Sequence, residues 1–292
     1  MTAASPPRRI GDWKIISAAV VATVALLLIL GRAVAYRAIE HQGLITPPNG
    51  PETPLTFGAP FTSLSLTSGD RRLDAVAVDA AQDSAPVIVV FHGTNEAVSY
   101  WADVQALWRS QGVASLVFDY SGFGRSTGRP SAVHCDEDAR VAYAAARAHF
   151  GAHRRYIVIG YSLGTGILLA AAHAFQPAPA GLAVVSGYSS AKEAAVAFLG
   201  IPRFVSMALP DLWNNVQSVR ALTLPVLVLH SRDDKTFPMW MAEAVQRSAG
   251  GPSRLVQLSG FEHADGHLRP TVEYWRPVLD FARSGALPAA QN

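Results

Sequence analysis

Cysteine, charged residues and basic tracts are scarce in this sequence of 292 residues. The single cysteine, Cys135, excludes a disulfide within the chain. Charged residues make up 16% of the chain, against roughly 25% in an ordinary soluble domain, which indicates a long apolar segment and a well-buried sheet. The net charge is only +2, and no basic tract follows the first residues. Nucleic acid is therefore not expected as a partner.

Patterns that hold cofactors are missing as well. The nine histidines show no metal-ligand spacing. No glycine-rich loop is followed by a lysine that would cradle a phosphate. The sequence therefore predicts no metal and no cofactor, and it leaves the oligomeric state open.

The longest apolar run covers residues 15–31 and contains no charge. As a helix it would span roughly 25 Å, slightly less than the roughly 30 Å hydrocarbon core of a bilayer. Aromatic and basic residues at both ends suit the two membrane interfaces: Trp13, Lys14, Arg32, Tyr36 and Arg37. Because Arg8, Arg9 and Lys14 precede the run, we expect the N-terminus to stay cytoplasmic and the rest of the chain to cross.

Two other interpretations of this run stay open. The small residues Ala33-Val34-Ala35 would suit cleavage of a secretory signal, although the run exceeds the usual apolar length of a signal and Arg32 crowds the cleavage position. A buried helix of a soluble protein is the third interpretation. An anchor and a signal both place the remaining chain on the far side of the membrane. We therefore divide the chain into an anchor or signal segment (1–41), a linker rich in proline and glycine (42–60), one domain (61–285) and a tail (286–292).

Strand and helix signals alternate along the domain, which is long enough for one large core. The expected strands are 61–66, 73–78, 86–91, 114–120, 156–159, 182–186, 225–230 and 254–258. The expected helices are 99–111, 134–150, 163–174, 239–248 and 271–283. The first two strands form an antiparallel hairpin, and the alternation predicts an α/β domain with a mostly parallel sheet and helices on both faces. Reactive groups of such sheets lie at the carboxyl ends of the strands.

Residues 199–220 do not follow this alternation. The segment is rich in proline and large apolar residues, including Pro202, Phe204, Met207 and Trp213. It is either an amphipathic helix that packs on the core or a small lid whose apolar side chains line a substrate pocket.

Gly160-Tyr161-Ser162-Leu163-Gly164 places a serine between a predicted strand and a predicted helix. In this context the pattern is typical of a nucleophilic serine on a strained turn, where glycines are needed on both sides. The helix that begins at Leu163 directs free N–H groups and its positive dipole end toward the serine, which would stabilise an oxyanion. A glycine-rich turn without chemistry is the alternative.

A serine hydroxyl needs a base, and the base needs a carboxylate that orients it. Asp233 and Asp234 follow the predicted strand 225–230, and we favour Asp234 because it would lie at the tip of the loop. His263 and His267 follow the last strand, and we favour His263 because it is closer to the strand end. The chain order Ser, Asp, His, with each residue after a strand, supports this choice.

Two N–H donors would form the oxyanion hole. Leu163 supplies one of them directly after Ser162. The loop after strand 86–91 supplies the other, because Gly93 allows a close approach and the amide of Thr94 is then the expected donor. His92 is expected to hold this loop by hydrogen bonding, without a catalytic role.

These motifs together resemble an α/β-hydrolase-fold serine hydrolase, and within that superfamily the membrane-anchored Bem46, ABHD13 and ABHD17-like group. The residues that carry the resemblance are His92-Gly93, Asp119 to Ser126 with Gly128, Gly160 to Gly164, Ser186 to Ser190, His230 through Asp234 to Pro238, and Glu262-His263. The resemblance implies Ser162 as nucleophile, His263 as base and Asp234 as its partner. It also implies hydrolysis of an ester, thioester or amide of a small-molecule or lipid acyl substrate, without choosing the substrate.

Two departures from the family pattern stand out. Glu262 occupies the position of a usual glycine before the histidine, and the His-Gly-Gly-Gly form of the oxyanion loop is absent, which argues against the lipase and esterase branches that use it. Perhydrolysis on the same triad and a non-catalytic binding protein of this fold remain alternatives. Dehalogenase chemistry is disfavoured because it would need an aspartate at position 162.

Overall fold

Eight strands form one sheet in the computed structural model, which describes residues 10–200, 202–206 and 209–289. Their order across the sheet is β1-β2-β4-β3-β5-β6-β7-β8. The pairs β1–β2 and β2–β4 are antiparallel, and every other pair is parallel. The strands are β1 (Thr62–Ser68), β2 (Arg71–Val78), β3 (Val87–Phe91), β4 (Ala114–Phe118), β5 (Tyr156–Tyr161), β6 (Gly181–Val185), β7 (Val226–Ser231) and β8 (Ser253–Leu258).

Alternating side chains of the central strands enter two separate apolar cores. In β3, Val87 and Val89 face one core while Ile88 and Val90 face the other, and all five residues of the strand are buried. A strand buried on both faces needs apolar residues throughout, which explains the continuous β-branched run. Burying each such side chain stabilises the fold by roughly 1.5–3 kcal/mol.

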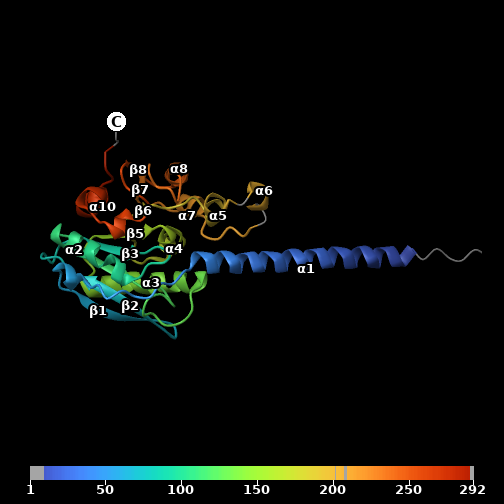
Figure 1. Ribbon diagram of the computed structural model, residues 1–292, viewed down its shortest axis with the longest axis horizontal. Coiled ribbons are helices and arrows are strands. Elements are labelled where there is room, and N and C mark those ends of the chain that lie inside the picture. Colours follow the sequence, from blue (N-terminus) through green and yellow to red (C-terminus); the bar gives the residue numbers. More distant parts are fainter. Residues whose placement is uncertain (1–9, 201, 207–208, 290–292) are drawn as a thin grey trace, which may run out of the picture.

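Helices cover both faces of the sheet (Figure 1). The first core packs against α3 (Ala132–Phe150), α4 (Leu163–Ala171), α7 (Asn215–Arg220) and α8 (Met239–Ser248). The second core packs against α2 (Ala102–Ser110) and α10 (Val272–Ser284). The shorter elements are η1 (Pro54–Phe57), η2 (Val98–Trp101), η3 (Ala172–Ala174) and α9 (Asp265–Leu268). This arrangement brings the carboxyl ends of β3, β5, β6 and β7 to one edge, because these strands run parallel.

The sequence-based expectation of a mostly parallel sheet with helices on both faces is confirmed. Most strand and helix boundaries agree within two residues. The expected helix 99–111 is divided into η2 and α2, and the end of the expected helix 163–174 tightens into η3. Helix ends often tighten in this way when the last turn cannot complete its longer hydrogen bonds.

A single helix over 199–220 is wrong. The structure has α5 (Ala191–Leu199), α6 (Arg203–Ser206) and α7 instead, with irregular chain between them. Pro202 and Pro210 lack the N–H that a continuous helix requires, and Trp213 has a positive φ of 49° that ends helical geometry. Ile201 and Met207 lie outside the described residues. We name residues 191–213 the cap segment.

A long apolar helix, α1 (Ile10–Gly43), leaves the domain and extends far beyond it (Figure 1). Its apolar part, Ile15–Gly43, contains an 18-residue stretch with a mean hydropathy of 2.3. None of the residues of that stretch is buried against the domain. The helix is therefore long and apolar enough to cross a membrane, and a signal sequence fits the same description. Arg8 and Arg9 lie outside the described residues.

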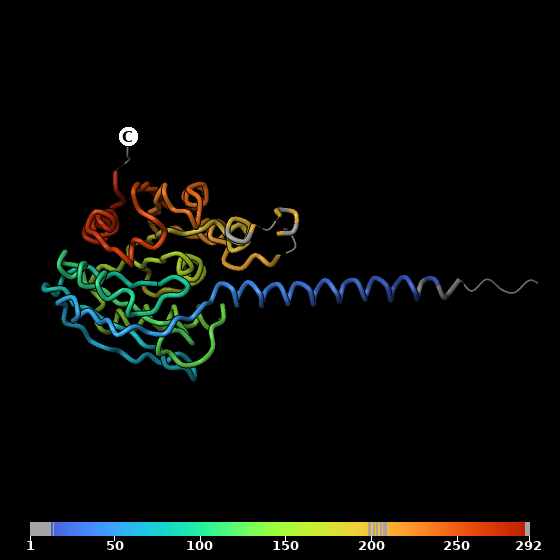
Figure 2. Tube along the Cα trace, viewed as in Figure 1, coloured from blue at the N-terminus to red at the C-terminus, as the bar shows by residue number. Residues whose placement is uncertain are grey.

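The expected linker, residues 42–60, runs along the domain surface (Figure 2). Leu44 and Ala59 are buried. The amide of Ile45 donates to Thr94 Oγ1 at 3.1 Å, and the amide of Gly50 donates to Ser99 Oγ at 2.8 Å. These contacts attach the chain that follows α1 to the loop after β3.

Candidate active site

Ser162 occupies a strained turn between β5 and α4. Its backbone has φ 50° and ψ −118°, a conformation that non-glycine residues rarely adopt and that persists only where the surrounding structure enforces it. A methyl group at Gly160 would lie 2.5 Å from the carbonyl oxygen of Gly164, and one at Gly164 would lie 1.9 Å from that of Phe91. The turn therefore requires glycine at both positions, as the sequence predicted.

The structure brings Ser162, Asp234 and His263 together from the ends of β5, β7 and β8. His263 Nε2 lies 2.9 Å from Ser162 Oγ, and His263 Nδ1 lies 2.7 Å from Asp234 Oδ2. An ionised carboxylate can only accept, so the Nδ1–H donates to Asp234 and leaves Nε2 free to accept the hydrogen of the serine hydroxyl. Ser162 and Asp234 are buried, and the His263 side chain is 19% exposed. The arrangement can transfer the serine proton to the imidazole.

Asp234 is held in its charged form by several donors. Burial acts to raise the pKa of the Asp234 carboxyl, but the hydrogen bond and charge of His263, the N–H of Phe237 and the charge of His230 together lower that pKa below its ordinary value. Oδ1 accepts from the amides of Thr236 and Phe237 at 2.8 and 2.9 Å. The carboxylate therefore stays charged and oriented toward the imidazole.

Asp233, the alternative carboxylate, points elsewhere. Its Oδ2 accepts from the amide of Gly260 at 2.6 Å, and the Asp233 side chain is exposed to solvent. It thus ties the loop after β7 to the loop after β8 without contacting an imidazole.

The alternative histidine, His267, is buried in a separate cluster. It stacks on Trp101 with ring centroids 6.0 Å apart, and its Nδ1 lies 3.8 Å from Glu96 Oε1. Glu96, which sequence reasoning missed, accepts from the amide of Gly93 at 3.0 Å and from Trp101 Nε1 at 2.8 Å. The only signal for Glu96 in the sequence was that it is the one carboxylate between β3 and Asp103.

The loop after β3 lies directly against the nucleophile candidate. A methyl at Gly93 would lie 3.2 Å from Ser162 Cβ, so glycine permits this close approach. The Gly93 amide is engaged by Glu96, which leaves the next amide, that of Thr94, as the candidate donor of this loop. Leu163 is the first residue of α4, and its N–H has no acceptor within the helix. The roles of Thr94 and Leu163 in an oxyanion hole stay predictions.

His92 and two residues after β4 hold this loop. His92 is fully buried, with Nδ1 2.8 Å from the carbonyl oxygen of Gly93 and Nε2 3.5 Å from Asp119 Oδ1. Tyr120 Oη donates to the carbonyl of His92 at 3.1 Å, and Asp119 Oδ1 accepts from the amide of Val98 at 2.8 Å. The conformation of the loop after β3 therefore depends on the loop after β4.

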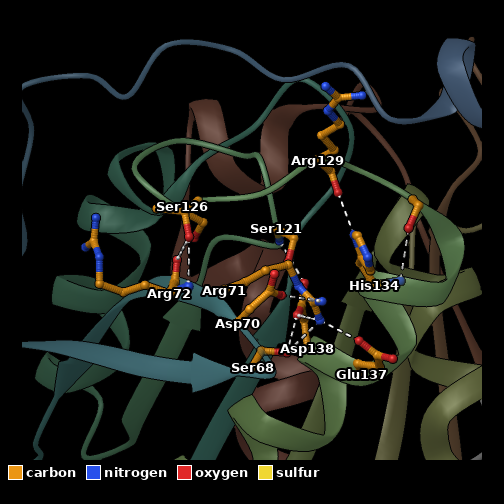
Figure 3. Close-up of polar contacts among 12 residues, drawn as sticks. Ser68, Asp70, Arg71, Arg72, Ser121, Ser126, Arg129, His134, Glu137 and Asp138 are labelled. Atoms are coloured by element: carbon orange, nitrogen blue, oxygen red, sulfur yellow. Dashed lines mark hydrogen bonds and ion pairs between the residues drawn. The ribbon is translucent and has the colours of Figure 1, made fainter.

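The loop after β4 is held in turn by a buried ionic network (Figure 3). Arg71 donates to the hydroxyls of Ser121 and Ser68 and to the carboxylate of Glu137. Asp138 accepts from the Ser68 hydroxyl and from the Ser121 amide. Because the charges of Arg71 and Asp138 are buried and paired, losing one partner would leave the other uncompensated.

The loop that carries His263 is secured from two sides. Tyr161 Oη donates to the carbonyl of His263. Glu262, which replaces the usual glycine of the family, pairs with Lys235 Nζ at 2.8 Å on the surface, and its amide donates to Asp265 at 2.8 Å. The departure at Glu262 therefore leaves His263 within hydrogen-bond distance of both Ser162 and Asp234.

Aromatic side chains lie against His263 and over α4. The ring of Phe237 meets that of His263 edge to face at 5.2 Å. Trp213 lies over α4, since a methyl at Gly166 would be 2.6 Å from Trp213 Cβ. Two surface hollows, one along α10 and one between η1, α2 and α9, contain none of the three hydrogen-bonded side chains of the site.

His230 gives a pH prediction for stability. Burial lowers the pKa of His230 below 6.5, although the hydrogen bond to the Phe237 carbonyl and the charge of Asp234 act to raise it, and His263 adds to the lowering. Below pH 6.5 the unfolded chain takes up a proton at this position before the folded chain does. Acid therefore destabilises the fold, and the contribution of neutral His230 is lost as pH falls from 6.5 toward the folded-state pKa.

We expect the thermal midpoint of the full chain in detergent to fall as the pH is lowered through this range. The midpoint of the His230→Gln variant should fall less steeply over the same range. Circular dichroism melts between pH 5 and 8 measure both slopes. Parallel slopes in the two proteins would show that His230 does not contribute.

The comparisons with known proteins agree with the fold. A family model described as alpha/beta hydrolase fold matches residues 86–202. The esterase Pf2001 of Pyrococcus furiosus has a similar structure, with a TM-score of 0.63 at 17% identity, covering 82% of this chain and 97% of that one. The chain is thus an α/β-hydrolase-fold protein, and the family resemblance stated from its motifs is confirmed at this level.

Its curated relatives are distant. An uncharacterized protein of Mycobacterium tuberculosis, Rv2307c, is 29% identical over 187 residues, which are 63% of this chain and 65% of that protein. The lysophosphatidylserine lipase ABHD12 of Rattus norvegicus is 27% identical over 223 residues, 69% of this chain and 55% of that protein. The uncharacterized membrane protein YNL320W of Saccharomyces cerevisiae is 20% identical over 241 residues, which are 80% of this chain and 83% of that protein. Distant homologues also include ABHD12B and ABHD17B. The chain spans less than two thirds of the length of most of these relatives.

Proposed function

We propose that the protein is a serine hydrolase that cleaves a carboxylic ester, thioester or amide through an acyl-enzyme intermediate. One observation carries this proposal: a continuous hydrogen-bonded chain runs from Ser162 Oγ through the His263 ring to Asp234, with separations of 2.9 and 2.7 Å. A strained serine, an imidazole of defined tautomer and a buried carboxylate are the parts that nucleophilic acyl transfer needs.

The geometry supports the following sequence of steps. His263 Nε2 accepts the Ser162 proton while Oγ attacks the acyl carbon, and the charge of Asp234 stabilises the imidazolium. The amides of Leu163 and Thr94 stabilise the tetrahedral oxyanion, each contributing about 10²–10³-fold in rate. His263 then protonates the leaving group. Water, deprotonated by His263, attacks the acyl-enzyme, and the serine regains its proton as the acid leaves.

A lipid or acylated substrate is the class that we propose. The apolar ring of Phe237 beside His263 and the indole of Trp213 over α4 suit an acyl chain better than a charged group. The distant homologue ABHD12 is named a lysophosphatidylserine lipase, which supports a lipid ester.

We propose further that α1 is retained as a single membrane anchor, with the hydrolase domain on the non-cytoplasmic side. The apolar helix and the relative named a membrane protein support an anchor. The orientation follows from the basic residues that precede the apolar run.

A fluorophosphonate probe tests the proposed nucleophile. We expect the folded chain to take up one probe molecule, and the label to lie on Ser162 within the tryptic peptide 156–192. Tandem mass spectrometry distinguishes Ser162 from the three other serines of this peptide, Ser186, Ser189 and Ser190. Heat-denatured protein is the control and should take up none. Labelling of another serine, or none in folded protein, would contradict the proposal.

A further inference from the structure

The last turn of α1 is fixed to the domain beside the nucleophile candidate. Glu40 is buried, and its Oε1 accepts from the amide of Ala132 at 2.6 Å at the start of α3. A methyl at Gly43 would lie 3.6 Å from Trp213 Cζ3 and 4.0 Å from Leu163 Cδ1. The apolar helix therefore ends against the residue that follows Ser162.

The chain after α1 is hydrogen-bonded to the loop after β3. The Ile45 amide donates to Thr94 Oγ1, and the Ile45 carbonyl accepts from the Asn95 amide at 2.8 Å. Both contacts lie within two residues of the end of α1. The direction in which α1 leaves the domain is thus coupled to the loop that approaches Ser162.

The cap segment carries an apolar tip. Between Ala194 and Pro210 the sequence contains one charged residue, Arg203, and no carboxylate. Pro202 is exposed, and the side chain of Phe204 is 77% exposed. In Figures 1 and 2, α6 projects from the domain in the same direction as α1. An exposed aromatic ring on a segment without carboxylates is unfavourable in water and suits a surface of lipid.

We infer that the tip of the cap segment, formed by the exposed residues Pro202 and Phe204, inserts into the surface of the bilayer that α1 crosses, so that Ser162 faces the membrane and receives acyl chains from it. This inference rests on the proposed function and on the anchor. The shared direction of α1 and α6 favours a bilayer over a protein partner, because a membrane that contains α1 would lie on the side of the domain from which α6 projects.

Site-specific fluorescence tests the contact in the full chain reconstituted in phosphatidylcholine vesicles. Cys135 is 1% exposed, so a thiol-reactive NBD label reacts at an introduced cysteine. Phe204→Cys is compared with Leu55→Cys, since Leu55 is 65% exposed in η1, which packs on α2 at the opposite end of the domain from α1 in Figure 1. We expect doxyl-labelled lipid to quench NBD at position 204 at least roughly twofold more than at 55, with emission at shorter wavelength. Equal quenching and emission at the two positions would overturn the inference.

A kinetic comparison tests delivery from the bilayer. Phe204→Asp is expected to slow hydrolysis of p-nitrophenyl palmitate held in the vesicles by roughly tenfold, and to leave hydrolysis of soluble p-nitrophenyl acetate unchanged. The matched variant Leu55→Asp should change neither rate. Equal slowing of both substrates by Phe204→Asp would contradict delivery from lipid. If the unmodified chain hydrolysed neither ester, the proposed function would fail, while the quenching measurement would still decide whether the tip contacts lipid.

Discussion

Replacing Ser162 by alanine is expected to lower kcat for p-nitrophenyl acetate by roughly 10⁴- to 10⁶-fold, with KM nearly unchanged. The reason is the position of Oγ, which is the oxygen 2.9 Å from His263 Nε2. Without that oxygen no acyl-enzyme forms, and the remaining groups can only bind the ester and polarise it. The variant keeps the strained backbone of this turn, because the glycines on both sides and their close packing are unchanged. Initial rates of the purified full chain in detergent measure the effect.

Ser110→Ala is the matched control. Ser110 is exposed at the end of α2. Its hydroxyl donates to the carbonyl of Leu107 at 2.7 Å and accepts from Gln111 Nε2 at 3.5 Å, both far from the site in sequence and local to α2. We expect this variant to keep the rate of the unmodified chain. If Ser162→Ala retained turnover, another residue would be the nucleophile and the proposed mechanism would be wrong.

Asp234→Asn is expected to lower kcat by about 10⁴-fold. The carboxylate of Asp234 accepts the Nδ1–H of His263, which keeps Nε2 free to receive the serine proton. An asparagine whose carbonyl oxygen keeps the bonds to the amides of Thr236 and Phe237 turns its NH₂ group toward the imidazole. The ring then carries its proton on Nε2 and cannot act as the base.

Asp233→Asn is the natural control, because it makes the same chemical change one residue away. The carbonyl oxygen of the introduced asparagine can still accept from the Gly260 amide, so the loop before His263 stays in place and kcat should hardly change. Circular dichroism of both variants at pH 7 separates lost catalysis from lost folding. A larger loss in Asp233→Asn than in Asp234→Asn would assign the orienting carboxylate to position 233.

Local patterns were sufficient for the fold class and for the nucleophile candidate. Strands β3 and β5 are rich in β-branched and aromatic residues because both of their faces are buried, and such runs are visible in the sequence. The turn around Ser162 is equally local, since the glycines at 160 and 164 serve contacts within one strand–turn–helix unit and its neighbouring strand. Of the two interpretations of residues 199–220, the single helix was wrong, because two prolines and the positive φ of Trp213 interrupt an apolar pattern that otherwise resembles a helix.

The sequence by itself determined the order of strands and helices, the apolar length of α1 and a short set of candidates at the strand ends. Only the tertiary structure decided which candidates meet: His263 rather than His267 lies against Ser162, although the two partners are 101 residues apart in the chain. The tertiary structure also decided that Glu96 accepts from the amide of Gly93 and that α1 ends beside Leu163. Contacts of this kind depend on how whole strands and loops pack in three dimensions, and residue spacing along the chain carries no record of that distance.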